Sequence, residues 1–449
     1  MYCGLKELYC SQMRRCVHRA AAGLMLLALL LWTGCGDVFR PVANPIPGPT
    51  TDPRNFHIAV VVSQNAVGNP GSGMQIDVSG DSNVGVVNTG QQPLYAALLP
   101  SSSRAFVSNG DGTITSFFPA GFSGSISAPT TTTLPAGLVP GFLFTTEAST
   151  MYVATSGNDT VDCQTPPSTG VVAAINTSSL AIENIMCVGA TPTVLTETPN
   201  GRKVYSVNGD GTVSSINTVD KSVNPPITAP SLTSPVWAVA SLDSSQVFVL
   251  DASGVVWIIN TFTDQVSVPA GQTASPSNFM ALETTHNRLY VTGTGTPSTL
   301  RILDATSPSL APVTAAPLIL PSGTTPVMVS FLPNGTRAYV LSVAANSPVV
   351  TIVNTSNNAI TGTLNLPSAT PNPNAVPFCQ AARFPFSMAA AGNSTRLYVA
   401  NCYAGATNIV DTSTNARVLT MSSPVSAYSP VSGASFPPPQ NPVFVVAGP

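Results

Sequence analysis

A short strand-like motif recurs seven times along this chain, and it limits the possible fold more than any other feature. Each copy holds an aromatic residue within an apolar segment, and six of the seven aromatics are followed directly by valine. The intervals between successive aromatics are 46, 53, 43, 42, 49 and 59 residues. Repeats of this length that are rich in short strand patterns are typical of the four-stranded blades of a β-propeller. The seven aromatics are Phe106, Tyr152, Tyr205, Phe248, Tyr290, Tyr339 and Tyr398.

A proline precedes each aromatic by 12 to 14 residues, and the spacing is 13 in five of the seven copies. Proline suits the first residue of a strand, where no ladder hydrogen bond is required from it. Turn residues that accept positive φ, such as Asn200-Gly201 and Asn334-Gly335, lie between the proline and the aromatic. The spacing therefore predicts an antiparallel hairpin in every repeat. The prolines are Pro93, Pro140, Pro192, Pro235, Pro276, Pro326 and Pro385.

A third strand is predicted after the aromatic strand. Several repeats continue to Ile or Val followed by Asn or Asp and then Thr, as in Ile216-Asn217-Thr218. Alternating apolar and polar residues with many β-branched side chains favour strands in these segments. A fourth, outer strand would then lead into the next repeat.

The two ends of the chain resemble parts of one further repeat. Residues 58–62, 74–78 and 84–87 are predicted to form second, third and fourth strands, whereas 442–446 is predicted to form a first strand. Joining them would close the ring and remove two exposed sheet edges, which otherwise invite aggregation. We therefore predict an all-β propeller of eight four-stranded blades, closed by the N- and C-terminal strands. If the terminal strands only complete an existing blade, the count is seven.

The first 34 residues have the layout of a bacterial export signal. Arg14 and Arg15 precede the apolar segment 20–31, and Thr33-Gly34 follows it as a small-residue cleavage site. Twelve apolar residues rise about 18 Å as a helix, well short of the roughly 30 Å hydrocarbon core of a bilayer. The pattern therefore predicts a cleaved signal, with the start codon at either Met1 or Met13.

The cysteine after this site, Cys35, resembles the acylated residue of the bacterial lipoprotein lipobox, although Trp32 stands where that motif usually has leucine. The resemblance implies that Cys35 is diacylated and becomes the new N-terminus, so that the protein is held in the cell envelope by its lipid. An outer-membrane or cell-surface location is favoured, and plain secretion is the alternative. Residues 35–55 contain five prolines and are predicted to form an extended tether, while 56–449 form the propeller.

Composition narrows the partners that such a propeller could bind. Hydrophobic residues make up 43% of the chain and argue against disorder, whereas charged residues make up only 8%. Removing the four basic residues and one acidic residue of the signal leaves 12 basic and 18 acidic residues. This balance lacks the basic stripe of a nucleic-acid-binding protein, so we predict no nucleic-acid partner.

Four cysteines remain once the signal and the acylated residue are set aside, and an even number in an exported protein predicts two disulfides. Three pairings are possible. We favour Cys163 with Cys187 and Cys379 with Cys402, because each pair lies within one repeat neighbourhood. No CxxC, CxxCH or clustered Cys and His occurs, so metal or haem attachment through cysteine is not predicted.

Two copies of the repeat, Tyr290-Val291-Thr292-Gly293 and Tyr398-Val399-Ala400-Asn401, approach a Tyr-Val-Thr-Asn step. In this respect residues 56–449 resemble the YVTN family of β-propellers and the wider group of surface-layer and YncE-like propellers. The resemblance implies the propeller fold and no particular function, because the matching residues are structural. Members usually have seven blades, so an eighth blade is a departure.

Few residues suggest chemistry. Residues 109–113 and 208–212 are identical, but each offers a single Asp, so we interpret both as hairpin turns and not as calcium loops. His57 and His286 are interpreted as surface residues, which leaves little support for histidine-based metal, haem or triad chemistry. We therefore predict no metal, no cofactor and no catalytic residue.

Two further pairs are given structural interpretations. Asp159 and Asp162 lie in a long segment beside Cys163 and are interpreted as residues of a solvated loop, although an acidic pair could serve acid-base chemistry. Trp237 and Trp257 fall on predicted strands and are assigned to the core.

One face of the predicted ring carries the long loops. In a propeller the fourth-to-first and second-to-third connections share a face, and the longest connections, 120–140, 157–170 and 366–384, are assigned to it together with all four cysteines. Long loops commonly carry binding sites. We therefore expect a partner to dock at this face, near Phe378, Arg383, Phe384 and Tyr403.

These features favour a non-enzymatic propeller scaffold of the cell envelope that binds a protein or a glycan at its loop-rich face. One alternative is an envelope enzyme of the propeller-lactonase type, which rests on analogy of fold alone. An enzyme of that kind should bring acidic or basic residues from several blades together at the central channel. A second alternative is a structural envelope component without a specific ligand.

Overall fold

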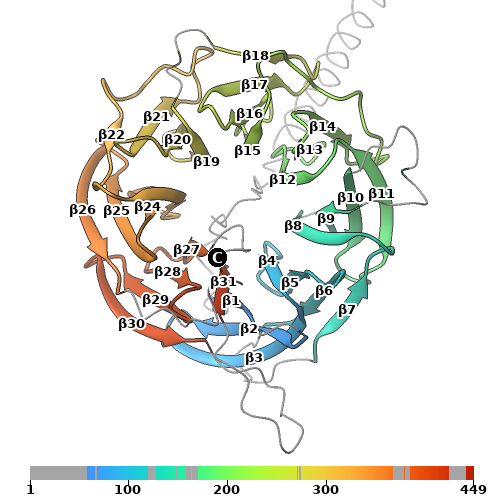
Figure 1. Cartoon of the computed structure of the whole chain (residues 1–449), viewed down its shortest axis with the longest axis horizontal. Helices are drawn as coiled ribbons and strands as arrows, with labels where there is room; N and C mark the ends of the chain where they lie inside the picture. The colour runs from blue at the N-terminus through green and yellow to red at the C-terminus, as the bar shows by residue number, and fades with distance from the viewer. Residues whose placement is uncertain are drawn as a thin grey trace, which may run out of the picture. The chain divides into compact units, whose positions relative to one another are not determined.

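The chain forms a ring of eight antiparallel sheets arranged around a central axis (Figure 1). The computed structural model describes residues 58–65, 68–119, 128–146, 149–157, 163, 170–269, 272, 275–367, 379, 385–423 and 441–448. All 31 named elements in these ranges are β-strands. The prediction of an eight-bladed all-β propeller is thereby confirmed, whereas the predicted signal, Cys35 and the tether lie outside the described residues.

The strands of each blade are given in order from the axis outward. Blade 1 consists of β31 (Asn441–Ala447), β1 (Ile58–Gln64), β2 (Pro70–Asp77) and β3 (Ser82–Gln91). Blade 2 consists of β4 (Pro93–Leu98), β5 (Ala105–Asn109), β6 (Thr113–Phe117) and β7 (Thr130–Thr133). Blade 3 consists of β8 (Val139–Thr145), β9 (Thr150–Ser156), β10 (Gly170–Asn176) and β11 (Ile182–Val188). Blade 4 consists of β12 (Pro192–Glu197), β13 (Lys203–Asn208) and β14 (Val213–Asn217).

The second half of the ring follows the same plan. Blade 5 consists of β15 (Pro235–Ala240), β16 (Gln246–Asp251), β17 (Val256–Asn260) and β18 (Val266–Ser267). Blade 6 consists of β19 (Ser277–Glu283), β20 (Arg288–Gly293), β21 (Thr299–Asp304) and β22 (Leu318–Ile319). Blade 7 consists of β23 (Thr325–Phe331), β24 (Arg337–Ala344), β25 (Ser347–Asn354) and β26 (Ala359–Asn365). Blade 8 consists of β27 (Phe386–Ala390), β28 (Arg396–Asn401), β29 (Ala406–Asp411) and β30 (Ala416–Ser422).

The ring closes by pairing the last strand of the chain with the first. Strand β31 pairs antiparallel with β1 from Ala59 opposite Ala447 to Gln64 opposite Asn441. It is the innermost strand of blade 1 and contacts the innermost strands of blades 8 and 2, β27 and β4. The predicted composite blade is therefore present, and no inner sheet edge is left open at the junction of the chain ends.

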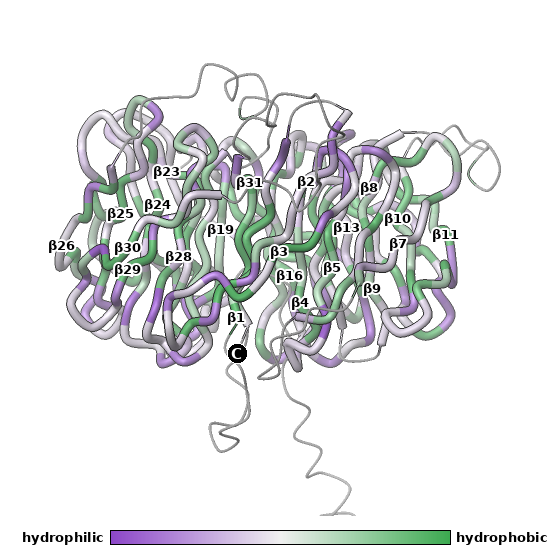
Figure 2. Tube along the Cα trace, turned by 90° about the horizontal axis from the view of Figure 1, so that it is seen from below, coloured by the Kyte–Doolittle hydropathy of each residue, from purple (hydrophilic) through white to green (hydrophobic). Residues whose placement is uncertain are grey.

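The two faces of the ring follow from the direction of the strands. The first strand of every blade runs toward a face that we call the terminal face, because β31 ends there and β1 begins there. The Gly448 N–H donates to the Ile58 carbonyl at this face over 2.8 Å. The opposite face, which we call the loop face, carries the second-to-third and fourth-to-first connections. In the side view of Figure 2, apolar residues concentrate in the layer between the two faces.

The recurring aromatic of each repeat lies at a junction between blades. The side chains of the seven aromatics are at most 1% exposed, and burying a side chain of this size contributes roughly 1.5–3 kcal/mol. Where the aromatic is tyrosine, its hydroxyl faces a polar residue in the third-to-fourth turn of the next blade. The Tyr205 hydroxyl donates to Asp264 over 2.7 Å, and the Tyr339 hydroxyl donates to Asn415 over 2.9 Å.

The turn residue that meets the aromatic adopts a positive φ, and its type follows the aromatic. Leu180 and Leu310, with φ of 59° and 48°, hold this place opposite the two phenylalanines, Phe106 and Phe248. Four tyrosines form hydrogen bonds with polar residues instead, namely Lys221, Asp264, Asn358 and Asn415. The fifth, Tyr398, lies near Asp81, but its buried hydroxyl has no hydrogen-bond partner among the described residues. Six of the seven aromatics therefore meet a turn residue of matching polarity, and a buried hydroxyl is costly without a polar partner.

Two segments depart from the predicted plan. In blade 4 the described fourth position is held by isolated bridges at Val223 and Ile227, and not by a named strand. The segment 120–140 was assigned wholly to the loop face, and this was wrong. Strand β7 divides it, so the connection from Phe117 to Thr130 begins and ends at the terminal face and only the part after Thr133 belongs to the loop face.

Candidate functional site

The loop face of blade 3 is fastened by a disulfide between Cys163 and Cys187, whose Cα atoms are 5.5 Å apart. Cys163 lies in the connection from β9 to β10, and Cys187 lies near the loop-face end of β11. The bond therefore ties a long connection to the outermost strand of its own blade. It confirms the pairing that we favoured from sequence.

A second disulfide joins Cys379 and Cys402 at the loop face between blades 7 and 8, with the Cα atoms 5.7 Å apart. Cys379 lies in the connection from β26 to β27, and Cys402 lies in the turn after β28. The Cys402 N–H also donates to the Pro385 carbonyl over 3.0 Å. Both disulfides hold loop-face segments, and both are compatible with an exported protein.

Of the four residues predicted near the docking position, the structure places one. Phe378, Arg383 and Phe384 lie outside the described residues. Tyr403 follows Cys402 and is only 9% exposed, with its ring 5.6 Å from that of Phe386. Its side chain therefore packs inward and supports the loop beside the disulfide.

The acidic turns of the loop face are structural. The connections at 109–113 and 208–212 are hairpin turns, as predicted, since they join β5 to β6 and β13 to β14. The Asp111 carboxylate accepts from the Thr113 hydroxyl over 2.6 Å and from the Gln91 N–H over 2.7 Å. Asp210 repeats the arrangement, accepting from the Ala190 N–H over 2.6 Å. Each carboxylate thus forms a hydrogen bond with the segment that leads into the first strand of its own blade.

Charge is distributed unevenly between the two faces. Among the described residues, the loop face holds three charged side chains, Asp111, Asp210 and Asp251, and Asp251 is itself buried and accepts from the Ser234 N–H over 2.8 Å. Every described Lys and Arg except Arg301 lies toward the terminal face. These basic residues are Arg104, Arg202, Lys203, Lys221, Arg288, Arg337, Arg396 and Arg417.

The basic residues of the terminal face bind neighbouring blades. Lys203 Nζ lies 2.8 Å from the Asp264 carboxylate, and Arg396 contacts both Asp81 and Asp411 at 2.9 Å. Burial lowers the pKa of Lys221, whose ammonium donates to a tyrosine hydroxyl of blade 3 over 2.7 Å. Most of these basic side chains thus contact other residues of the ring, and the exposed charges of the described loop face are the carboxylates Asp111 and Asp210.

The axis of the ring is lined by aromatic and aliphatic side chains. Tyr95 packs edge-on against Phe142 and Phe444 with centroids 5.6 and 5.4 Å away, and Trp237 lies 4.4 Å from Phe279. These five side chains are at most 9% exposed. Within the described part of the chain, the innermost strands carry two charged residues, which lie at their terminal-face ends. These residues are Glu197 and Glu283.

The remaining candidates from the sequence are placed as follows. Trp237 and Trp257 are 2% and 6% exposed, so their assignment to the core is confirmed. His286 lies in the turn between β19 and β20, partly exposed, with Nδ1 2.9 Å from the Glu283 carboxylate. His57, Asp159 and Asp162 lie outside the described residues. In the part of the chain that the structure describes, no three His, Cys, Asp or Glu side chains are grouped as metal ligands would be.

Among the described residues no helix has the length and hydrophobicity needed to cross a bilayer.

Several solved propeller structures are similar to this chain. Apo AztD from Citrobacter koseri is 12% identical with a TM-score of 0.59, covering 88% of this chain and 99% of AztD. The dihydro-heme d1 dehydrogenase NirN in complex with DHE is 10% identical with a TM-score of 0.62, covering 91% and 79%. The propeller of Dos1 is 13% identical with a TM-score of 0.50, covering 64% and 74%. At these identities the likeness shows the fold alone. No protein-family model and no curated protein matches the sequence.

Proposed function

We propose that this chain is an exported, lipid-anchored propeller of the cell envelope, built from YVTN-type repeats, which binds a protein or glycan partner at its loop face without catalysis. The observation that carries the proposal is that the chain enters the ring at one face and the disulfide-fastened loops lie at the opposite face. The chain enters the ring at the terminal face, where Ile58 begins β1, whereas both disulfides fasten segments at the loop face. An anchor placed before Ile58 would leave the loop face directed away from the membrane.

The distance to the membrane follows from the length of chain between Cys35 and Ile58. This segment spans at most about 80 Å when fully extended, and its prolines favour extension over collapse. The propeller could therefore project from an outer-membrane or cell-surface anchor. Its loop face would be accessible to large partners.

The chemistry of the loop face favours an uncharged or weakly charged partner. Its described carboxylates, Asp111, Asp210 and Asp251, are engaged by turn N–H groups, and the one described Lys or Arg near it, Arg301, is buried against the Gly254 carbonyl. Hydroxyl, amide and backbone groups remain, and these suit a neutral glycan or a polar protein surface. Disulfides lower the entropy that the loops lose on binding, which strengthens a site of this kind.

The docking position that we propose lies beside the Cys379–Cys402 disulfide, at Phe378, Arg383, Phe384 and Tyr403. The aromatic axis supports a binding role, since the described inner strands bring apolar side chains to the centre in place of convergent acid-base groups. Tyr403 would act indirectly, by holding the loop through Phe386.

The anchor is tested by Cys35→Ser in the full-length chain expressed in a bacterium with lipoprotein processing. We expect the unaltered protein in the membrane fraction with an acyl mass increment on Cys35, and the variant in the soluble exported fraction. An unaltered protein that is soluble and lacks the acyl mass would contradict the anchor while leaving the loop-face site open to its own test.

The binding site is tested by affinity capture from envelope extracts that contain both proteins and polysaccharide. The triple variant Phe378→Ala, Arg383→Ala, Phe384→Ala should lose the partner that the unaltered chain retains. The matched control is Val219→Ser with Phe262→Ser at the terminal face, where these side chains are 86% and 92% exposed. Retention of the partner by the triple variant, or its loss in the control, would overturn the proposed position.

A further inference from the structure

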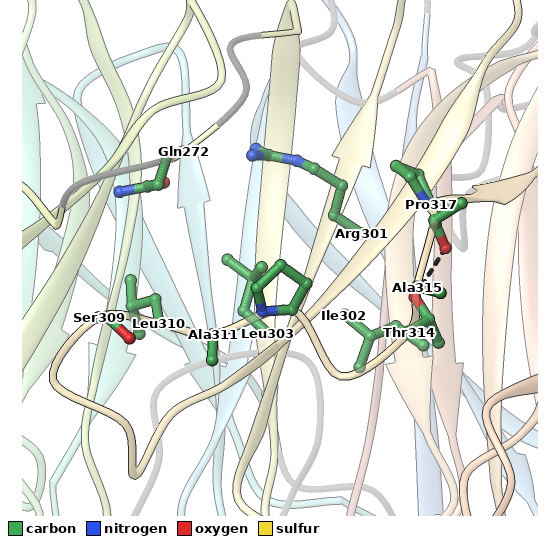
Figure 3. Close-up of a pocket in the computed structure, with 12 residues that line it drawn as sticks. Gln272, Arg301, Ile302, Leu303, Ser309, Leu310, Ala311, Thr314, Ala315 and Pro317 are labelled. Carbon is green, nitrogen blue, oxygen red and sulfur yellow. Dashed lines mark hydrogen bonds between the residues drawn. The ribbon is translucent and has the colours of Figure 1, made fainter.

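A cavity of about 290 Å³ lies at the outer side of blade 6, next to blade 5. Apolar side chains form most of its wall, and Arg301 and Gln272 lie along one side (Figure 3). Figure 3 shows both of these side chains extending into the same region above Leu303 and Leu310. The cavity is separate from the loop-face site proposed above.

The cavity exists because blade 6 departs from the repeat. Its outer strand β22 pairs with β21 at only two positions, Thr299 with Ile319 and Leu300 with Leu318. Contact resumes where the Val313 N–H donates to the Ile302 carbonyl over 2.8 Å, so residues 314–317 bulge outward between the two contacts. In blade 7, by comparison, β25 and β26 pair at six positions, from Val349 opposite Asn365 to Asn354 opposite Ala359. The bulge separates this outer segment of blade 6 from β21 and leaves the cavity beside Arg301.

Arg301 is also a departure from the repeat. It lies three residues before the end of the third strand, a place held by uncharged residues in other blades, including Ser214, Trp257 and Thr351. Arg301 is only 7% exposed and donates to the Gly254 carbonyl of blade 5. Burial lowers its pKa. In blade 6 a charged side chain in the middle of the third strand thus lies beside an outer strand that opens next to it.

The other polar groups around the cavity are engaged with the protein itself. The Gln272 amide donates to the Val256 carbonyl over 2.7 Å and accepts from the Val256 N–H over 2.9 Å, as a strand partner would. The Thr314 hydroxyl donates to the Ala316 carbonyl over 2.8 Å. No Asp or Glu is among the residues that line the cavity. Among the described residues that line the cavity, Arg301 is therefore the charged one, and its guanidinium carries five N–H donors.

We propose that this cavity binds a small monocarboxylate, whose carboxylate pairs with Arg301 and whose apolar body lies against Leu303, Leu310 and Pro312. A planar carboxylate matches the paired donors of a guanidinium and forms a strong charge-assisted contact in a site of low polarity. Burying the charged Arg301 side chain costs free energy of desolvation. A neutral carbonyl such as that of Gly254 compensates for less of this cost than a carboxylate would. The volume suits a ligand of roughly ten non-hydrogen atoms, at the small end of ligand cavities.

The proposal is tested by titrating the purified full-length protein with benzoate and hexanoate at pH 7, followed by calorimetry and ligand-observed NMR. Benzamide and hexanamide are the neutral controls, because they keep the shape and lose the charge. We expect at least one carboxylate to bind with a Kd of about 1 mM or tighter, and its amide to bind at least tenfold more weakly. Inorganic phosphate is titrated in parallel as a different class of anion.

Three variants decide the role of the cavity. Arg301→Gln should weaken carboxylate binding at least tenfold, and Ala316→Phe should do the same by filling the space while leaving Arg301 in place. Arg337→Gln is the control, since that guanidinium also donates to a carbonyl of a neighbouring blade, Thr412, but lies outside the cavity. Unchanged binding in Arg301→Gln or Ala316→Phe would overturn the proposal. The proposal would also fail if phosphate bound and neither carboxylate did, or if no carboxylate bound at a ligand concentration ten times the expected Kd.

Discussion

The hydrogen bond between a tyrosine and a polar turn residue that recurs at four blade junctions can be tested at Tyr339 and Asn415, where the hydroxyl donates to the amide oxygen over 2.9 Å. Tyr339→Phe removes a hydrogen bond between neutral groups and should cost about 0.5–1.5 kcal/mol of stability. Asn415→Leu leaves a buried hydroxyl without its acceptor, at about 1–3 kcal/mol. It also places leucine at a φ of 52°, where a side chain without a local hydrogen bond costs roughly 1 kcal/mol more.

The double variant recreates the apolar junction that the protein already has at Phe106 and Leu180. Because the double variant has no hydroxyl to leave unpaired, its loss of stability should be smaller than the sum of the two single losses by about 1–2 kcal/mol. Urea denaturation of the four proteins gives these differences. Arg337 also donates to the Asn415 amide oxygen over 3.5 Å, and because both Asn415→Leu proteins lose this contact, it cancels in the comparison. Losses that add to within about 0.5 kcal/mol would show that the two positions are independent and would refute the junction rule.

Three further perturbations follow from the structure. The double variant Cys163→Ala, Cys187→Ala removes the first disulfide, whose cysteines are 24 residues apart in sequence. Its free energy of unfolding, measured by urea denaturation, should be lower by about 3 kcal/mol. An unchanged urea midpoint would contradict a stabilising role for this disulfide. Hydrogen bonds from the Ser413 hydroxyl and the Thr414 N–H, together with Arg396, lower the pKa of Asp411 from 3.8 to about 2. Its contribution to the free energy of unfolding should therefore be complete above pH 4 and be lost as the pH falls toward 2. Denaturation measured across this pH range should show that Asp411→Asn lacks this part of the pH dependence. Deleting residues 441–449 removes β31 and should replace cooperative unfolding of a monomer by aggregation, detected by light scattering; a soluble, fully folded ring without β31 would contradict closure by this strand.

Sequence periodicity predicted most of the fold because each blade repeats the same local chemistry. The spacing from proline to aromatic sets a hairpin of fixed length, so the inner strands begin within one residue of their prolines, as at Pro93 and Pro326. The composite blade was predictable since strands 58–62 and 442–446 each lacked partners. The disulfide pairs followed from proximity within a repeat.

The departures were not predictable from the repeat, because they depend on contacts between blades. Nothing local in residues 314–317 indicates that they bulge beside Arg301, since the cavity also needs Gln272, which is held against Val256 of blade 5. The match of Leu180 to Phe106 and of Asn415 to Tyr339 was present in the sequence. It becomes visible only once each third-to-fourth turn is placed against the second strand of the preceding blade.

The central claim of the functional account is that partners meet the loop face while the terminal face is turned toward the anchor. A photo-crosslinking amino acid can be placed at exposed loop-face positions, Thr233 and Ser322, and at an exposed terminal-face position, Val219, in cells that make the full-length protein. We predict discrete cross-linked products with a protein or glycan from at least one of Thr233 and Ser322 and none from Val219. Products formed from Val219 alone would contradict the account.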